Sequence, residues 1–291
     1  MGALEGRVAV ITGAGRGIGR EHALLFAREG AKVVVNDLGA AMDGSGGDRT
    51  AAEQVVAEIV ALGGQAVANH DDVTDWEAGR RLVETAVDAF GDLHVLVNNA
   101  GILRDRVLVN MTEDEWDTVI RVHLKGHFVP TRHAAAYWRE RSKQGIDVKA
   151  SVVNTSSTSG LLGNGGQANY GAAKSGIATL TLIAAQELSR YGVRVNAVVP
   201  AARTRLTEST PGLGELIRAP EDGRFDPWDP ANVSPLVAYL ATEDCPANGR
   251  VLFVQGGTIA NFQNWTMTDR VERPGRWTLA ELRQEMKRLD A

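Results

Sequence analysis

The 291-residue sequence is poor in cysteine and has no long apolar run. Its one cysteine, Cys245, excludes a disulfide framework and any site built from several cysteine ligands. No apolar stretch approaches the roughly 18–20 residues that a membrane-spanning helix needs. Hydrophobic residues nevertheless form 44% of the chain, which is too apolar for an intrinsically disordered protein. These features predict a soluble globular protein that folds without disulfide bonds.

Clusters of positive charge are also lacking. The chain has 31 Lys and Arg residues against 36 Asp and Glu residues, a formal net charge of −5. Without a basic cluster, neither nucleic acid nor a membrane is expected as a partner. Met1–Arg7 lead directly into a strand pattern and leave no room for a signal peptide, which favours a cytoplasmic location.

Short apolar runs alternate with helical patterns along the chain. The run Lys32–Asp37 holds three consecutive valines, as expected for a strand that is covered on both faces of a parallel sheet. The alternation predicts an α/β fold: a doubly wound, Rossmann-type parallel sheet of about seven strands in one domain, residues 1–260. Strands are predicted at Arg7–Thr12, Lys32–Asp37, Gln65–His70, Leu93–Val97, Ser151–Thr155, Val193–Val199 and Arg250–Gln255. Helices are predicted at Arg20–Arg28, Thr50–Leu62, Asp75–Phe90, Glu113–Arg141 (with irregularities at Gly126 and Pro130), Ala168–Arg190 and Asn232–Thr242.

Residues 261–291 form a tail beyond this domain. Thr278 and Glu281 have the spacing of a helix capping box, and an apolar stripe follows. We expect a helical tail that packs on its own domain or on a neighbouring subunit; a helix that gates the substrate site is the alternative.

The stretch Thr12–Gly19 follows the first strand and opens the first helix. Its glycines allow a pyrophosphate to approach the backbone, and a helix N-terminus favours negative charge. Asp37 ends the second strand, where a carboxylate can accept both hydroxyls of an adenosine ribose. It would repel a 2′-phosphate by about 1 to 4 kcal/mol at about 4 Å, which predicts NAD as the cofactor. Arg16 could instead pair with a 2′-phosphate.

Four motifs occur in the order that is typical of the short-chain dehydrogenase/reductases, and the resemblance runs from Arg7 to Gly257. They are the glycine-rich stretch from Thr12 to Gly19, Asn98-Asn99-Ala100-Gly101, Ser157, and Tyr170-x-x-x-Lys174. The segments Val35–Gly39, Asn99–Arg106, Val122–Gly126 and Gly163–Tyr170 also resemble the subgroup of (3R)-hydroxyacyl-CoA dehydrogenase domains in peroxisomal multifunctional enzymes type 2 and their bacterial relatives.

The resemblance implies a set of cofactor contacts. Asp72 and Val73 would contact the adenine, and Thr204 would face the nicotinamide carboxamide. The family usually has Pro-Gly where this chain has Pro200-Ala201, which affects the register of Thr204. The predicted cofactor-binding residues are Thr12, Gly13, Arg16, Gly17, Ile18, Gly19, Asp37, Asp72, Val73, Asn99, Ala100, Gly101, Tyr170, Lys174 and Thr204.

Tyr170 and Lys174 share one helix face, and the resemblance implies a proton relay at the alcohol or carbonyl oxygen. A phenol with a pKa of about 10 needs a downward shift of about 3 units to act as a base near neutrality, and the Lys174 ammonium and a nicotinamide cation could supply it. Ser157 would hydrogen-bond the substrate oxygen, with Ser156 as the alternative. His123 replaces the family's asparagine; it is a predicted catalytic residue, or else a packing residue in the helix.

His123 and His127 also have the i, i+4 spacing of zinc ligands, but no third ligand is evident, so no metal is expected. The predicted function is an NAD-dependent dehydrogenase acting on a small molecule, a 3-hydroxyacyl-CoA or a steroid-type alcohol. The alternatives are an NADPH-dependent 3-oxoacyl-(acyl-carrier-protein) reductase and a non-catalytic cofactor-binding regulator. The substrate pocket wall is expected from Thr204 to Pro230. The resemblance implies a homodimer or homotetramer formed through the helices Glu113–Arg141 and Ala168–Arg190.

Overall fold

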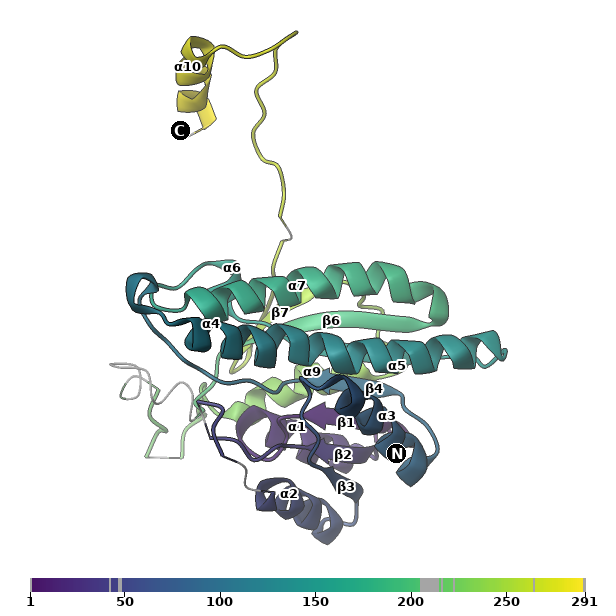
Figure 1. Cartoon of the computed structure of the whole chain (residues 1–291). Coiled ribbons are helices and arrows are strands. Elements are labelled where there is room, and N and C mark those ends of the chain that lie inside the picture. The colour runs from purple at the N-terminus through teal and green to yellow at the C-terminus, as the bar shows by residue number, and fades with distance from the viewer. Residues whose placement is uncertain are drawn as a thin grey trace. The chain divides into compact units, whose positions relative to one another are not determined.

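The computed structural model describes residues 2–41, 43–46, 49–204, 215, 217–221, 223–263 and 265–289 (Figure 1). They form two compact units, Met1–Asn261 and Phe262–Ala291. Within the described parts of the chain, no helix is both long enough and apolar enough to span a bilayer.

An eight-stranded sheet forms the centre of the first unit, in the order β3-β2-β1-β4-β5-β6-β7-β8. The first seven strands are parallel, as predicted, and β8 pairs antiparallel with β7. The extra edge strand was not predicted; Gly256-Gly257 turns the chain back in two residues. The strands are β1 (Val8–Thr12), β2 (Lys32–Asn36), β3 (Gln65–Asn69), β4 (Val95–Asn98), β5 (Ala150–Thr155), β6 (Val193–Pro200), β7 (Val251–Gln255) and β8 (Thr258–Asn261).

Helices cover both faces of the sheet, which confirms the doubly wound architecture (Figure 1). One face carries α1 (Gly17–Arg28), α2 (Thr50–Ala61) and α9 (Ser234–Ala241), which follows the short helix η4 (Pro230–Val233). The other carries α3 (Trp76–Phe90), α4 (Glu113–Ile120), α5 (Gly126–Lys143) and α7 (Ala168–Leu188). Short helices lie at η1 (Leu108–Asn110), α6 (Thr158–Leu161) and η3 (Ser189–Tyr191).

The long helix predicted over Glu113–Arg141 is interrupted. Between α4 and α5 the chain forms one π-helical turn, η2 (Arg121–Lys125), which ends just before Gly126. A π turn holds one more residue than an α turn, and such turns occur frequently at functional sites.

The alternation of side chains along the strands builds two cores. Ala9 and Ile11 of β1 pack with α1, α2 and α9, whereas Val8 and Val10 pack with α3, α5 and α7. Successive strand residues point to opposite faces, so a strand covered on both sides must be apolar throughout. This explains the uninterrupted valines of β2.

The strand order changes direction between β1 and β4. In such sheets a crevice opens outside the carboxyl ends of the strands at this switch point, where ligands bind. The loops that follow β1, β2, β4, β5 and β6 therefore meet at one edge of the sheet.

The second unit contains α10 (Leu279–Leu289). The capping box is present: the Thr278 hydroxyl accepts from Glu281 N at 3.3 Å, and the Glu281 carboxylate accepts from Thr278 N at 2.8 Å. The packing of this tail on the domain or on a neighbouring subunit stays a prediction.

Candidate active site

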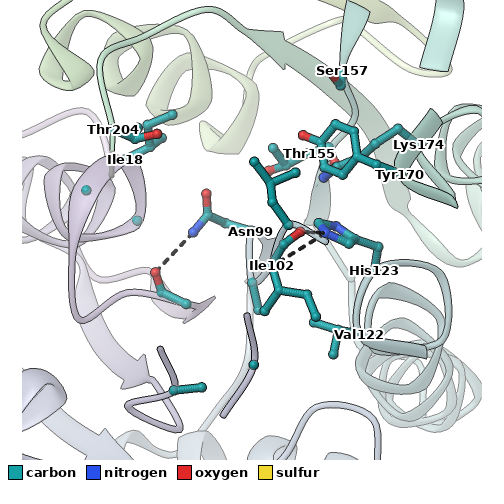
Figure 2. A pocket seen from close by; sticks show the side chains of 18 of the residues that line it. Ile18, Asn99, Ile102, Val122, His123, Thr155, Ser157, Tyr170, Lys174 and Thr204 are labelled. Carbon is teal, nitrogen blue, oxygen red and sulfur yellow. Dashed lines mark hydrogen bonds between the residues drawn. The ribbon is translucent and has the colours of Figure 1, made fainter. Parts of the chain in front are cut away.

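A cavity of about 560 Å³ lies at the carboxyl edge of the sheet, in the size range of small-molecule sites (Figure 2). All of the predicted site residues except Thr12 line it. They are Gly13, Arg16, Gly17, Ile18, Gly19, Asp37, Asp72, Val73, Asn99, Ala100, Gly101, His123, Ser157, Tyr170, Lys174 and Thr204.

Thr12 does not line the cavity, but it joins two of the loops that do. Its hydroxyl accepts from the backbone N–H groups of Asn99 at 3.0 Å and Ala100 at 3.1 Å. The Asn99 amide in turn donates to the carbonyls of Thr12 at 3.0 Å and Gly13 at 3.1 Å. The glycine-rich loop and the loop after β4 thus form one hydrogen-bonded surface.

The glycines of this loop are required by close backbone approaches. A Cβ on Gly19 would lie 2.2 Å from the Gly13 carbonyl oxygen, and a Cβ on Gly13 would lie 2.7 Å from Ala100 Cα. The cap residue of α1, Arg16, makes no capping hydrogen bond through its side chain, and the first turn of α1 holds no acidic residue. The start of α1 at the cavity therefore retains backbone donors for an anion, and it carries the positive end of the helix dipole.

The Asp37 carboxylate is fixed by two backbone donors. Its Oδ2 accepts from Gly15 N and its Oδ1 from Gly39 N, both at 2.7 Å. A carboxylate has about four acceptor positions, so both oxygens retain capacity for ribose hydroxyls. Asp72 accepts from Thr74 N at 2.8 Å, which shapes the turn that presents Val73 to the cavity.

Lys174 is buried beside the phenol of Tyr170. Its Nζ donates to the Thr155 carbonyl at 2.6 Å and lies 5.4 Å from the centroid of the Tyr170 ring. Burial penalises the ammonium and lowers the pKa of Lys174 to about 7.

The pKa of Tyr170 shifts in the direction opposite to the sequence expectation. Burial raises it to about 12, and hydrogen bonding with Ser157 opposes this rise only partly. The negative charge of Asp105 adds to the rise. The phenol therefore holds its proton at neutral pH and is poised to donate it.

The two serines after β5 have different surroundings. The buried Ser156 donates through its hydroxyl to the Lys174 carbonyl at 2.8 Å and so joins β5 to α7. Ser157 is partly exposed at the cavity, near Tyr170 (Figure 2). This arrangement favours Ser157 as the group that meets a substrate oxygen.

His123 lies in the π turn and is buried. Its Nε2 lies 2.7 Å from the Ile102 carbonyl oxygen and 3.1 Å from the Ile102 nitrogen (Figure 2). Burial, followed by the charge of Lys174, lowers the pKa of His123 to about 3, so the imidazole is neutral at pH 7. Within the described residues, no group of three or more His, Cys, Asp or Glu side chains could hold a metal ion.

Several lining residues were not predicted. The loop after β2 contributes Leu38, Ala41 and Gly44. Their roles depend on contacts across the fold and carry no local motif. Of the expected wall Thr204–Pro230, the cavity includes Thr204 and Trp228, whereas residues 205–214, 216 and 222 lie outside the described residues.

Comparison with known proteins gives consistent matches. The family model for short chain dehydrogenases matches residues 7–211. The chain is 46% identical to hydroxyacyl-CoA dehydrogenase ChsB1 of Mycobacterium tuberculosis, over 88% of this chain and 79% of that protein. It is 46% identical to peroxisomal multifunctional enzyme type 2 of Drosophila melanogaster, over 84% of this chain but only 38% of that longer protein. A 3-oxoacyl-[acyl-carrier-protein] reductase of Thermotoga maritima is 38% identical over 88% of this chain and 99% of its own length.

A solved structure is also similar. The crystal structure of a short chain dehydrogenase from Mycobacterium avium superposes with a TM-score of 0.87 at 50% identity, covering 99% of this chain and 95% of that one.

Proposed function

The chain belongs to the short-chain dehydrogenase family and is an oxidoreductase, and from this premise we propose that it uses NAD to interconvert a secondary alcohol and a ketone. The observation that carries the proposal is the convergence of Ser157, Tyr170 and Lys174 on the cavity that the glycine-rich loop and Asp37 also line. Substrate and cofactor sites must adjoin for a hydride to pass between them.

The residues present fit a nicotinamide dinucleotide, which the family and the fold imply. The backbone donors at the start of α1 suit the pyrophosphate, and the glycines leave room for it. Asp37 suits two ribose hydroxyls and would repel a 2′-phosphate, which supports NAD over NADP. Asp72 and Val73 suit the adenine, and Thr204 the nicotinamide end. The bound cofactor supplies the hydride acceptor or donor.

Ser157, Tyr170 and Lys174 act on the substrate oxygen. Ser157 donates a hydrogen bond that fixes the oxygen beside the phenol. Tyr170 donates its proton to that oxygen when a ketone is reduced and takes a proton from it when an alcohol is oxidised. The nearby Lys174 ammonium stabilises the phenolate that remains after Tyr170 donates its proton, and that must be present before Tyr170 can accept one; Lys174 also holds the cofactor ribose.

For His123 the surroundings support a positioning role. A neutral imidazole with Nε2 next to the Ile102 backbone holds the loop after Gly101 and packs against Tyr170. A catalytic proton transfer by His123 stays a prediction that a pH profile can separate from this role.

The proposed substrate class is a 3-hydroxyacyl-CoA thioester or a steroid-type alcohol. One relative supports the thioester by its name, hydroxyacyl-CoA dehydrogenase. The alternative, reduction of a 3-oxoacyl group on acyl carrier protein with NADPH, has a less similar relative and is disfavoured by Asp37. The presence of Ser157, Tyr170 and Lys174 in one cavity argues against a non-catalytic regulator.

The test is the absorbance of reduced cofactor with the purified full-length chain. NAD and NADP are each offered with 3-hydroxyacyl-CoA thioesters and with free hydroxysteroids, and NADH and NADPH are each offered with 3-oxoacyl thioesters. Turnover of a hydroxyacyl thioester with NAD is the expected result. Turnover with NADPH on 3-oxoacyl carriers, and none with NAD, would overturn the cofactor and substrate proposals together.

We further propose a homodimer or homotetramer that forms through α4–α5 and α7. These helices expose large apolar side chains: Trp116 is 39%, Phe128 42% and Ile183 48% exposed. Light scattering of the purified chain tests this, and a monomer at micromolar concentration would contradict it. The cytoplasmic location and the lack of nucleic-acid and membrane partners stay predictions.

A further inference from the structure

Residues 38–41 and 43–46, the described residues of the loop that follows Asp37, reach the segment after β4. Leu38, Ala41 and Gly44 of this loop line the same cavity as Asp72 and Val73. A Cβ on Gly44 would lie 3.3 Å from Ile102 Cδ1 and 3.9 Å from Thr118 Cγ2, so the loop backbone packs directly on the opposite wall. The loop therefore covers the end of the cavity where the proposed function places the adenosine.

The tip of the loop is a compact turn. Ala41 N donates to the Ser45 carbonyl at 2.7 Å, and the Asp43 carboxylate accepts from the Ser45 nitrogen at 2.9 Å and hydroxyl at 2.7 Å. These hydrogen bonds hold the backbone of Asp43, whose carbonyl oxygen faces the Arg104 guanidinium.

Arg104 joins this turn to α4. Its Nε donates to the Asp43 carbonyl at 2.9 Å, while its Nη1 pairs with Asp114. The backbone of Arg104 is itself held, because the fully buried Asn169 donates through its amide to the Arg104 carbonyl at 3.0 Å. The guanidinium fork can make both contacts at once, which the single ammonium of a lysine does less well.

We propose that Arg104 is a positioning residue that fastens the β2–α2 loop over the adenosine half of the cofactor and slows cofactor release. The inference rests on the proposed function, because it concerns how the same site retains NADH. The loop begins directly after Asp37, and Gly39 N donates to the Asp37 carboxylate, so the position of the loop is linked to the carboxylate that takes the ribose. Arg104 acts through the loop and not on the reacting atoms.

The test measures NADH release from the purified full-length chain by stopped-flow fluorescence. Arg104→Met keeps the length of the side chain and removes its charge and donors. We expect its NADH dissociation rate to rise roughly tenfold, as for the loss of one charge-assisted hydrogen bond. Arg104→Lys should recover part of the loss. The matched control is Arg106→Met, since the Arg106 guanidinium pairs with Glu115 on the same helix instead.

Competition by ADP-ribose distinguishes this role from a general loosening of the site. ADP-ribose has the adenosine half without nicotinamide, so its affinity should fall in Arg104→Met as much as that of NADH. An unchanged release rate, an equal acceleration in Arg106→Met, or unchanged ADP-ribose affinity would each overturn the inference. If Arg104→Met does not fold, Asp114→Asn replaces it, because this change weakens the ion pair that holds the Arg104 guanidinium. NADH release from Asp114→Asn should be several-fold faster than from wild type. An unchanged release rate in that variant would also overturn the inference. Failure of the wild-type chain to bind NADH would instead refute the proposed function and this inference with it.

Discussion

The imidazole of His123 meets the phenol ring of Tyr170 edge to face, with ring centroids 5.1 Å apart and planes at 88°. Such T-shaped pairs are favourable. On its other side the imidazole lies against Gly101, where a Cβ would come within 2.4 Å of His123 Cε1. One neutral side chain thereby lies between the loop after β4 and Tyr170 and contacts both.

Replacing His123 tests this arrangement. In His123→Leu the buried Ile102 backbone loses its polar partner, at a cost of about 1–3 kcal/mol, so kcat/KM should fall roughly five- to 150-fold. His123→Gln can place an amide near Ile102 and should recover part of the loss. Because the pKa of His123 is lowered to about 3, the pH–rate profile should keep its shape in the glutamine variant. Loss of a kinetic pKa between 6 and 7 would show instead that His123 transfers protons.

Removing the Tyr170 hydroxyl should abolish most of the turnover. In Tyr170→Phe no group remains to give or take the proton at the substrate oxygen, and we expect kcat to fall by at least about 10²–10⁴. NADH affinity, measured by fluorescence titration, should fall much less than kcat, because the aromatic ring is kept. The control is Tyr239→Phe, at a residue 52% exposed on α9, which should retain wild-type kinetics. Wild-type turnover in Tyr170→Phe would refute the proposed chemistry.

Asp37 should govern the choice of cofactor. Asp37→Ser removes the negative charge that opposes a 2′-phosphate, so the ratio of kcat/KM for NAD to that for NADP should fall at least tenfold. Initial rates with both cofactors measure it. Asp88→Ser removes an exposed carboxylate from α3 and should leave the ratio unchanged. An unaltered ratio in Asp37→Ser would place cofactor selection elsewhere.

A methyl group on Gly19 should damage cofactor binding. In Gly19→Ala the new Cβ would lie 2.2 Å from the Gly13 carbonyl, so the loop must move. We expect NADH affinity to fall at least tenfold in calorimetry, because the backbone donors lose their alignment. Gly257→Ala adds the same methyl in open space and should bind normally. Equal affinities in the two variants would contradict the tight fit of the loop.

The buried His22 should make the fold sensitive to acid. Burial lowers the pKa of His22 from 6.5 to about 3, so below pH 6.5 the unfolded chain binds a proton that the folded chain does not. Stability should therefore fall with decreasing pH, by up to about 1.4 kcal/mol per pH unit from this group. Urea denaturation at pH 7 and pH 5 should show a smaller difference for His22→Asn than for wild type.

The partner of His22 provides the control for that experiment. Ser234→Ala removes the hydroxyl that lies 2.8 Å from His22 Nδ1 but keeps the titrating ring. It should lower the free energy of unfolding at both pH values without reducing the difference between them. If Ser234→Ala and His22→Asn reduce that difference equally, proton uptake by His22 is not its cause.

The sequence predicted what depends on local spacing. The four-residue spacing of Tyr170 and Lys174, the glycines before α1 and the valines of β2 each require one geometry, and the structure has it. The π turn around His123 could not be predicted, because it arises where α4, α5 and α7 pack together. The bond from Arg104 to Asp43 joins residues 61 positions apart. The raised pKa of Tyr170 follows from burial, which is a property of the whole fold.

The π turn at Arg121–Lys125 also limits how this chain can change in length. A π turn takes up one more residue than an α turn, so deleting one residue here can restore an ordinary α turn without rotating α5 against α4. The deletion would instead disturb the five residues that place the His123 imidazole beside Ile102. Deleting a residue within α5 would rotate the part of the helix that follows by about 100° and turn Trp138 away from the core. The length of the turn therefore serves the site, whereas the length of α5 serves the support of the sheet.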